Sequence, residues 1–265
     1  MGFVESVSSS FDGVPVAFEV SGSGSSTVVF VHGLVGDHTD FDLQAGFLAS
    51  TRRVVAVDLP GAGESGHDRL SWTMEGFGED VATVVNHLGL DRVVLVGHSL
   101  GGNVTVEAAR RLGGRVAGLV WLSSFRSLDS FPSTSETAAW LAPFHADPLA
   151  AVEDLNRRNF GPDADPVLIN SVVAKARARD PERTLGLVTA MFQHDRTVAE
   201  ALTHLDAPVV AINPTFKPID EESFRRHGVD LKLINGVGHF LMMEAPSALN
   251  NQLQQLLDGP LQTRT

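Results

Sequence analysis

The sequence contains no cysteine in its 265 residues, and it is poor in positive charge. Without cysteine, disulfide bonds, zinc–thiolate sites, iron–sulfur clusters and a thiol nucleophile are excluded. The 20 Lys and Arg residues stand against 32 Asp and Glu residues, which gives a formal net charge of −12. Because proteins bind the nucleic-acid backbone through clustered basic side chains, we expect no nucleic-acid partner.

Long apolar runs are missing as well. No apolar stretch is long enough to span a bilayer. The first residues, "MGFVESVSSSFDG", lack the basic region and apolar core of a signal peptide. We therefore expect a cytoplasmic protein without a membrane partner, and no pattern in the sequence indicates an oligomeric state.

What the chain does contain is an alternation of apolar runs and helical patterns over residues 1–124. Runs such as "TVVFVHG", "RRVVAV", "RVVLVG" and "VAGLVWLSS" are typical of buried parallel strands. Between them lie helical patterns, one of which has Thr73 as its expected N-cap and Gly89 as its expected stop. Strands separated by helices of this length predict an α/β fold with a doubly wound, mostly parallel sheet.

The pattern changes over residues 125–205, where only helical segments appear. Several of them begin with Asp and Pro, as in "DPLAAVEDLNRRNF" and "DPVLINSVVAKARARD". The alternation of strand and helix resumes over residues 206–265. We therefore predict one α/β core, formed by residues 1–124 and 206–265, with an all-helical cap inserted at 125–205.

The stretch "RVVLVGHSLGGNV" places Ser99 between an apolar strand and a helix, inside a GxSxG motif. Such a serine sits on a sharp turn, and the glycines let the strand and the helix approach each other closely. The amide of Leu100, at the start of the helix, is the expected first donor to an oxyanion. The amide of Leu34, in "FVHGLVG" after an earlier strand, is the candidate for the second donor.

The loop "GVGHF" follows the last predicted strand and carries His239. Together with "VHG" at 31–33, "DLPGAGES" at 58–65 and "GHSLGG" at 97–102, this loop makes the chain resemble the α/β-hydrolase fold family, in its serine hydrolase branch with a helical cap. The resemblance covers nearly the whole chain. It implies that Ser99 is the nucleophile and His239 the general base.

The third catalytic group, the acid, departs from the family pattern. Relatives usually carry an aspartate shortly after the strand that corresponds to "APVVAI", where this chain has "NPTFKPID" with Thr215 and Lys217. We assign Asp220 as the acid, although its position also suits a helix N-cap. Asp129, beyond the end of the strand before the cap, is the second candidate. A Ser–His dyad in which a hydroxyl or backbone group orients the imidazole is the third.

No spacing of histidines and carboxylates indicates a metal site, and no phosphate-binding loop is present, so we expect neither a metal nor a cofactor.

Apolar residues of the cap predict a small or medium apolar substrate. The resemblance implies a serine hydrolase of the carboxylesterase type (EC 3.1.1) that cleaves an ester or lactone through an acyl-enzyme. The alternatives are a non-hydrolytic member that binds a ligand or acts as a lyase or oxygenase, and a hydrolase of a thioester or carbon–carbon bond.

Overall fold

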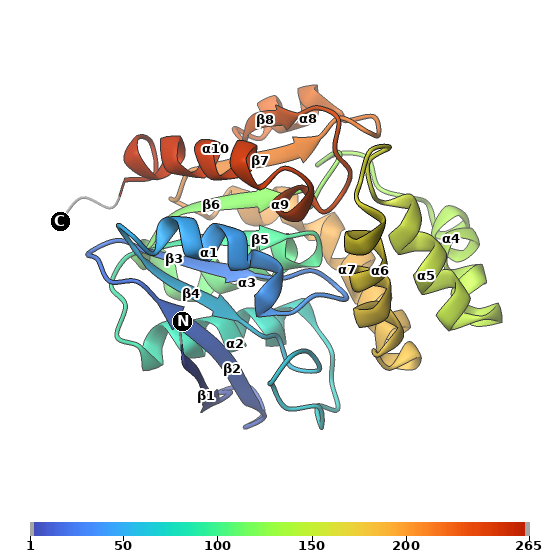
Figure 1. Cartoon of the computed structure of the whole chain (residues 1–265), viewed down its shortest axis with the longest axis horizontal. Coiled ribbons are helices and arrows are strands. Elements are labelled where there is room, and N and C mark those ends of the chain that lie inside the picture. Colours follow the sequence, from blue (N-terminus) through green and yellow to red (C-terminus); the bar gives the residue numbers. More distant parts are fainter. Residues whose placement is uncertain (1–2, 263–265) are drawn as a thin grey trace.

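A computed structural model describes residues 3–262, and an eight-stranded sheet forms its centre (Figure 1). The sheet order is β1-β2-β4-β3-β5-β6-β7-β8, with β1 and β2 antiparallel to each other, β2 antiparallel to β4, and the other neighbours parallel. The strands are β1 (Phe3–Ser8), β2 (Pro15–Ser21), β3 (Thr27–Val31), β4 (Arg53–Val57), β5 (Val93–His98), β6 (Val116–Leu122), β7 (Val209–Pro214) and β8 (Asp230–Ile234). This confirms the predicted fold class. Residues 1–2 and 263–265 of the predicted core lie outside the described residues.

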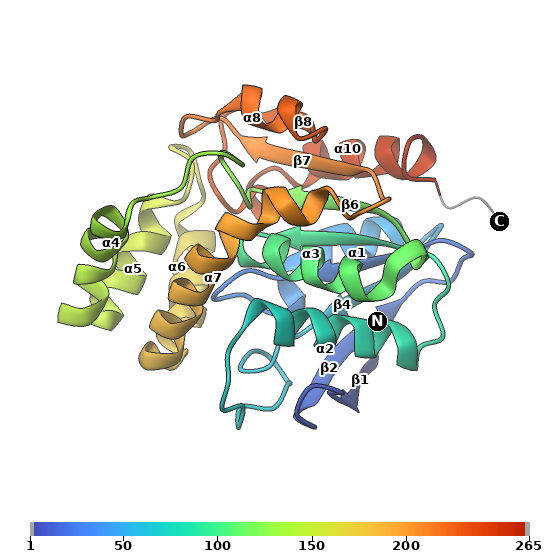
Figure 2. The ribbon, with the colours of Figure 1, turned by 180° about the vertical axis from the view of Figure 1, so that it is seen from behind.

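Helices cover both faces of the sheet (Figures 1 and 2). On one face lie α1 (Asp42–Leu48) and α10 (Pro246–Asp258), and on the other lie α2 (Met74–His87) and α3 (Leu100–Leu112). All five residues of β3 are buried, and its four apolar residues alternate between an apolar cluster with α2 and α3 and a second cluster with α1 and α10. Because the central strands are buried on both faces, they appear in the sequence as unbroken apolar runs.

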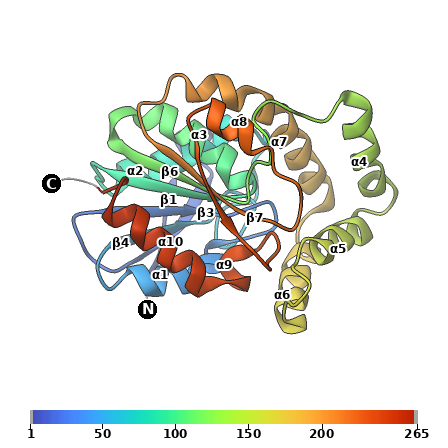
Figure 3. The same ribbon diagram turned by 90° about the horizontal axis from the view of Figure 1, so that it is seen from above.

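Residues 125–205, the helical insert, connect β6 to β7. The insert consists of α4 (Thr134–Ala146), α5 (Pro148–Arg158), α6 (Pro166–Arg177) and α7 (Pro181–Leu202). The last three helices begin with proline after an aspartate whose side chain caps the helix, as the sequence predicts. Figures 1 and 3 show α4, α5 and α6 beside the ends of the strands, whereas α7 also packs along α3.

The remaining helices are short, and they are α8 (Glu221–Arg226), α9 (Leu241–Glu244) and the 3₁₀ turns His38–Phe41 and Gly113–Arg115. Within residues 3–262, no helix combines the length and the apolar character that crossing a bilayer would require.

Two glycines determine how closely α3 approaches the sheet. A Cβ atom on Gly97 would lie 2.3 Å from the carbonyl oxygen of Gly101, and a Cβ atom on Gly101 would lie 2.3 Å from the carbonyl oxygen of Val31. Real side chains cannot occupy these positions without displacing backbone. The two glycines of the GxSxG motif therefore allow the tight turn between β5 and α3 on which Ser99 lies.

We predict that Gly97→Ala lowers the free energy of unfolding by about 1–3 kcal/mol, the usual cost of overpacking. The matched control is Gly46→Ala in α1, where nothing lies within 4 Å of the added Cβ. Alanine in that helix should raise stability by about 0.5–1 kcal/mol. Urea denaturation of both variants measures the difference, and equal stabilities would contradict the close approach.

Candidate active site

The ends of four neighbouring parallel strands meet at the helical insert. In the order of the sheet these strands are β5, β6, β7 and β8. Ser99 follows β5 directly and Ser123 follows β6 directly, while Lys217 and His239 lie on the loops after β7 and β8. All four line one cavity. Because parallel strands end at the same edge of a sheet, residues that are far apart in the sequence are brought together here.

Ser99 has a strained backbone, with φ 53° and ψ −121°, and it is the N-cap residue of α3. Its amide donates to the carbonyl oxygen of Leu122 at 3.0 Å, which ties the turn to the neighbouring strand. A non-glycine residue in such a conformation costs on the order of 1–3 kcal/mol, and strain of this kind clusters at functional sites. The strain is consistent with a serine presented as a nucleophile at the start of a helix.

The turn after β3 lies against Ser99. A Cβ atom on Gly33 would be 3.1 Å from the Cβ atom of Ser99, and the amide of Gly36 closes the turn by donating to the carbonyl oxygen of Gly33 at 3.1 Å. Leu34 lies within this turn and lines the cavity with Ser99. As the first residue of α3, Leu100 has no acceptor for its amide inside the helix. Leu100 is thus adjacent to the serine in the chain, and Leu34 lines the same cavity.

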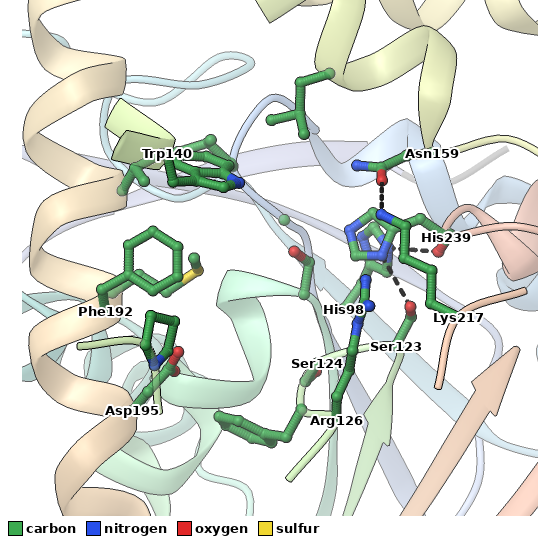
Figure 4. Close-up of a pocket in the computed structure, with 18 of the residues that line it drawn as sticks. His98, Ser123, Ser124, Arg126, Trp140, Asn159, Phe192, Asp195, Lys217 and His239 are labelled. Carbon is green, nitrogen blue, oxygen red and sulfur yellow. Dashed lines mark hydrogen bonds between the residues drawn. The ribbon is translucent and has the colours of Figure 1, made fainter. Parts of the chain in front are cut away.

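His239 is held by its neighbours on three sides (Figure 4). Its ring Nδ1 lies 2.8 Å from the hydroxyl oxygen of Ser123. Its amide donates to the carbonyl oxygen of Asn159 in the helical insert at 2.6 Å. Its own carbonyl oxygen accepts from Nε2 of His98 at 3.0 Å. The buried His98 thus holds the backbone of the loop that carries His239.

Glu244 fixes the loop that carries His239. Its carboxylate accepts from the amides of Gly238 at 3.0 Å and Phe240 at 3.2 Å, which flank His239 in the sequence. The same carboxylate accepts from the amide of Gly161 in the helical insert at 2.7 Å. One side chain therefore joins the loop after β8 to the insert.

Ser123 lies directly after β6, the strand that precedes the insert. Its backbone is also strained, with φ 50°, and its amide donates to the carbonyl oxygen of Ile212 in β7 at 3.0 Å. The positive φ turns the chain out of the strand at this point. The partner of the imidazole is therefore a neutral hydroxyl, which corresponds to the third of the sequence-based alternatives.

The structure does not bring Asp220 to His239, which corrects our assignment of Asp220 as the acid. Asp220 is the N-cap of α8: its exposed side chain accepts from the amide of Ser223 and from the hydroxyl of Ser127 at 2.9 Å. The capping pattern, which the sequence shows equally well, is the one that the carboxylate follows.

Asp129, the second candidate, is also engaged elsewhere. It pairs with Arg226, and one of its oxygens lies 2.6 Å from Nε2 of His227. Among residues 3–262, no carboxylate lies within ion-pairing distance of the His239 ring. The sequence indicates a hydroxyl partner only in general terms, because a serine after a strand carries no signal that singles out Ser123.

The surroundings of His239 disfavour its charged form. Burial is the largest cause of a His239 pKa well below the ordinary value, and three nearby groups lower it further: His98, Lys217 and Arg126. Burial, together with the charges of Arg126 and Arg158, lowers the pKa of Lys217 itself to about 8. At neutral pH the site therefore contains a neutral imidazole next to positive charge.

The cavity between the strand ends and the helical insert has a volume of about 1090 Å³. The insert contributes an apolar wall in which the rings of Trp140 and Phe192 lie edge to face, with centroids 5.2 Å apart. Met191 and Leu155 extend this wall. A cavity of this size and lining suits a small or medium organic molecule.

Within residues 3–262, one cluster has ligand atoms close enough together to suggest a metal, and it is formed by Glu75, Glu107 and His194. Both ring nitrogens of His194 are already hydrogen-bonded, to Asn103 at 2.7 Å and to Glu107 at 3.0 Å. The cluster therefore forms a polar contact between α3 and α7, and we assign no metal to it.

The comparisons with known proteins agree with the fold. Residues 28–252 match the Alpha/beta hydrolase family. The chain belongs to this family. Among solved structures, the chain superposes on a thermophilic esterase from Thermogutta terrifontis with a TM-score of 0.85 and 24% identity, covering 97% of this chain and 99% of the esterase. A likeness at this level of identity concerns the fold.

Relatives in sequence match a shorter part. The chain is 37% identical over 107 residues to the dihydrolipoyllysine-residue acetyltransferase component of an acetoin cleaving system from Pseudomonas putida, a match covering 40% of this chain and 29% of that protein. It is 39% identical over 115 residues to a non-heme haloperoxidase from Rhodococcus erythropolis, covering 43% of this chain and 42% of that protein. These matches span less than half of either relative, so they do not establish an activity for this hydrolase-family chain.

We predict that replacing Lys217 by methionine raises the pKa of His239, because a positive charge that opposes the imidazolium is removed. The Cε1 proton resonance of His239, assigned with a His239→Asn variant, would report the titration by NMR. In the wild type it should titrate below the ordinary 6.5. The control is Lys232→Met, whose ammonium pairs with Asp230 at 2.8 Å on β8. A His239 pKa that does not respond to Lys217→Met would contradict this account.

Proposed function

We propose that this chain is a serine hydrolase that cleaves a carboxylic ester or lactone through an acyl-enzyme, with Ser99 as nucleophile and His239 as general base. The observation that carries the proposal is the strained Ser99 at the start of α3, lining one cavity with His239. Strain is retained where it serves a purpose, and presenting a hydroxyl for attack is such a purpose. The helical insert, in this proposal, acts as a cap that shapes the substrate cavity.

In the first half of the reaction, the hydroxyl oxygen of Ser99 attacks the ester carbonyl while its proton passes to His239. The amides of Leu34 and Leu100 donate to the oxyanion of the tetrahedral intermediate. When the intermediate collapses, His239 returns the proton to the departing alcohol. Water then attacks the acyl-enzyme with His239 as base, which releases the acid and restores Ser99.

Ser123 acts as a positioning residue. When Nδ1 of His239 carries the proton, it donates to the hydroxyl oxygen of Ser123, and Nε2 is left free to accept a proton. An aspartate in this place would also stabilise the imidazolium by its charge. A hydroxyl provides the orientation without the charge, so we expect a slower hydrolase toward neutral esters than one with a carboxylate.

The missing carboxylate also favours a second candidate function. A member of the family that binds its ligand without acyl transfer would need the cavity but not a charged partner for His239. The two candidates differ in whether Ser99 is nucleophilic.

We predict that a fluorophosphonate probe labels the folded chain at Ser99 and that Ser99→Ala abolishes the labelling. The same substitution should lower kcat for short p-nitrophenyl esters by at least about 10³-fold, because no other group supplies the nucleophile. Mass spectrometry of the labelled peptide identifies the site. Folded protein that neither labels nor turns over these esters would establish the ligand-binding candidate and end the hydrolase proposal.

A second prediction concerns Ser123. Ser123→Ala should lower kcat about three- to tenfold, since a neutral hydrogen bond contributes about 0.5–1.5 kcal/mol. Ser123→Asp should instead raise kcat for a neutral ester by about tenfold, because a charged partner strengthens the bond to the imidazolium and aspartate tolerates a positive φ.

The matched control is Asp220→Asn, which keeps a good N-cap and removes only a charge. Its kcat should stay within about twofold of the wild type on the proposal that Asp220 is structural. A loss of 10³-fold or more in Asp220→Asn, with Ser123→Ala unaffected, would return the role of the acid to Asp220.

A further inference from the structure

Two cationic side chains lie on the same side of the cavity as His239. Figure 4 shows Arg126 and Lys217 there, while Trp140, Phe192 and Asp195 line the opposite side. Arg126 comes from the chain just after β6, and Lys217 comes from the loop after β7. Arg126 is exposed and Lys217 is partly buried.

Neither cation has a carboxylate partner within residues 3–262. Lys217 donates one hydrogen bond, to the side-chain oxygen of Asn159 at 2.9 Å, and its Nζ lies 4.8 Å from the centre of the Phe216 ring. The guanidinium of Arg126 lies 5.9 Å from the centre of the same ring. An ammonium has three donors and a guanidinium has five, so most of this donor capacity is free to face a ligand.

Many basic side chains in residues 3–262 pair with a carboxylate, and these two cations do not. With 32 acidic side chains against 20 Lys and Arg, a basic side chain has many possible partners. Lys175 of the insert, for example, pairs with Asp37 at 2.7 Å and Asp40 at 2.8 Å. Placing two like charges in one partly desolvated wall is unfavourable unless an anion joins them.

We infer that Arg126 and Lys217 form a subsite for a carboxylate of the substrate, so that the hydrolase acts on the monoester of a dicarboxylic acid. The inference rests on the proposed function and names its substrate class. The planar fork of Arg126 suits a carboxylate, which it can bind through two parallel hydrogen bonds. The reaction then converts the monoester and water into the dicarboxylic acid and the alcohol.

The position of this subsite matters for the chemistry. Both cations lie close enough to His239 to disfavour its imidazolium. A carboxylate bound between them would offset that effect during the reaction, when His239 holds the proton of Ser99. The substrate would then bring the negative charge that Ser123 lacks, and a charged ester should gain in kcat as well as in KM.

The opposite wall of the cavity carries a negative charge, which favours one orientation of the proposed substrate. Asp195, which accepts from the side-chain amide of Asn103 at 2.9 Å, lies across the cavity from the cations. Burial raises the pKa of Asp195 to about 6, so it is mostly charged at neutral pH. It repels a carboxylate on its own side, which leaves the side of Arg126 and Lys217 for the acid group.

The test compares monoethyl glutarate with its neutral isostere, ethyl 4-carbamoylbutanoate, by measuring released ethanol. We expect kcat/KM to be about tenfold or more higher for the charged ester, with part of the difference in kcat. Lys217→Met and Arg126→Met should each bring the ratio of the two substrates close to one. Lys217→Arg, which keeps the charge, should retain most of the ratio, and so should the control Lys232→Met.

A second measurement works without turnover. Free glutarate should protect Ser99 from fluorophosphonate labelling better than its neutral diamide, glutaramide, does, and Lys217→Met should lose this difference. Equal turnover of the two esters together with equal protection would overturn the carboxylate subsite while leaving the hydrolase intact. Failure of the probe to label Ser99 in the folded wild type would instead count against the proposed function itself.

Discussion

The parallel pairing of β5, β6, β7 and β8 is the constraint on which the whole site depends. Each of these strands ends at the same edge of the sheet, and each delivers one group to the cavity: Ser99, Ser123, Lys217 and His239. The backbone hydrogen bonds from Ser99 to β6 and from Ser123 to β7 extend this pairing past the ends of the strands. A slip in register between any two of them would separate the groups.

The site differs from a site with an aspartate in its distribution of charge. A neutral hydroxyl lies beside the imidazole, and the loop after β7, where the family resemblance implies an aspartate, carries Lys217. The imidazole is therefore a weaker proton acceptor than one paired with a carboxylate, but it stays neutral over a wider range of acidic pH. Such an arrangement makes sense when the missing negative charge arrives with the ligand.

The sequence predicts some parts of this structure better than others. The alternation of strands and helices is visible in the sequence as a pattern of apolar residues. The glycines at 97 and 101 are also recognisable, because a close backbone approach tolerates no side chain. The same patterns place Ser99 and His239 at strand ends. A serine after a strand leaves no such pattern, so the role of Ser123 emerges only when its distance to His239 is known.

Asp220 illustrates the converse. Its sequence context suits both a helix cap and a catalytic acid, and these two interpretations differ only in the direction of the Asp220 side chain. Local hydrogen bonds to Ser127 and Ser223 decide the matter, and these depend on the loop after β6, which approaches α8 only in the folded chain. Pairwise contacts between distant segments are the information that a single sequence does not contain.

The carboxylate of Glu244 has a consequence for how such a protein can change over time. Because it binds the loop of His239 and Gly161 of the insert together, the insert is not an independent module. A different set of helices could be exchanged between β6 and β7 only if the short stretch at 159–161 were kept, since it also receives the amide of His239. Substrate range could diversify through the outer helices, whereas this inner junction would have to be inherited unchanged.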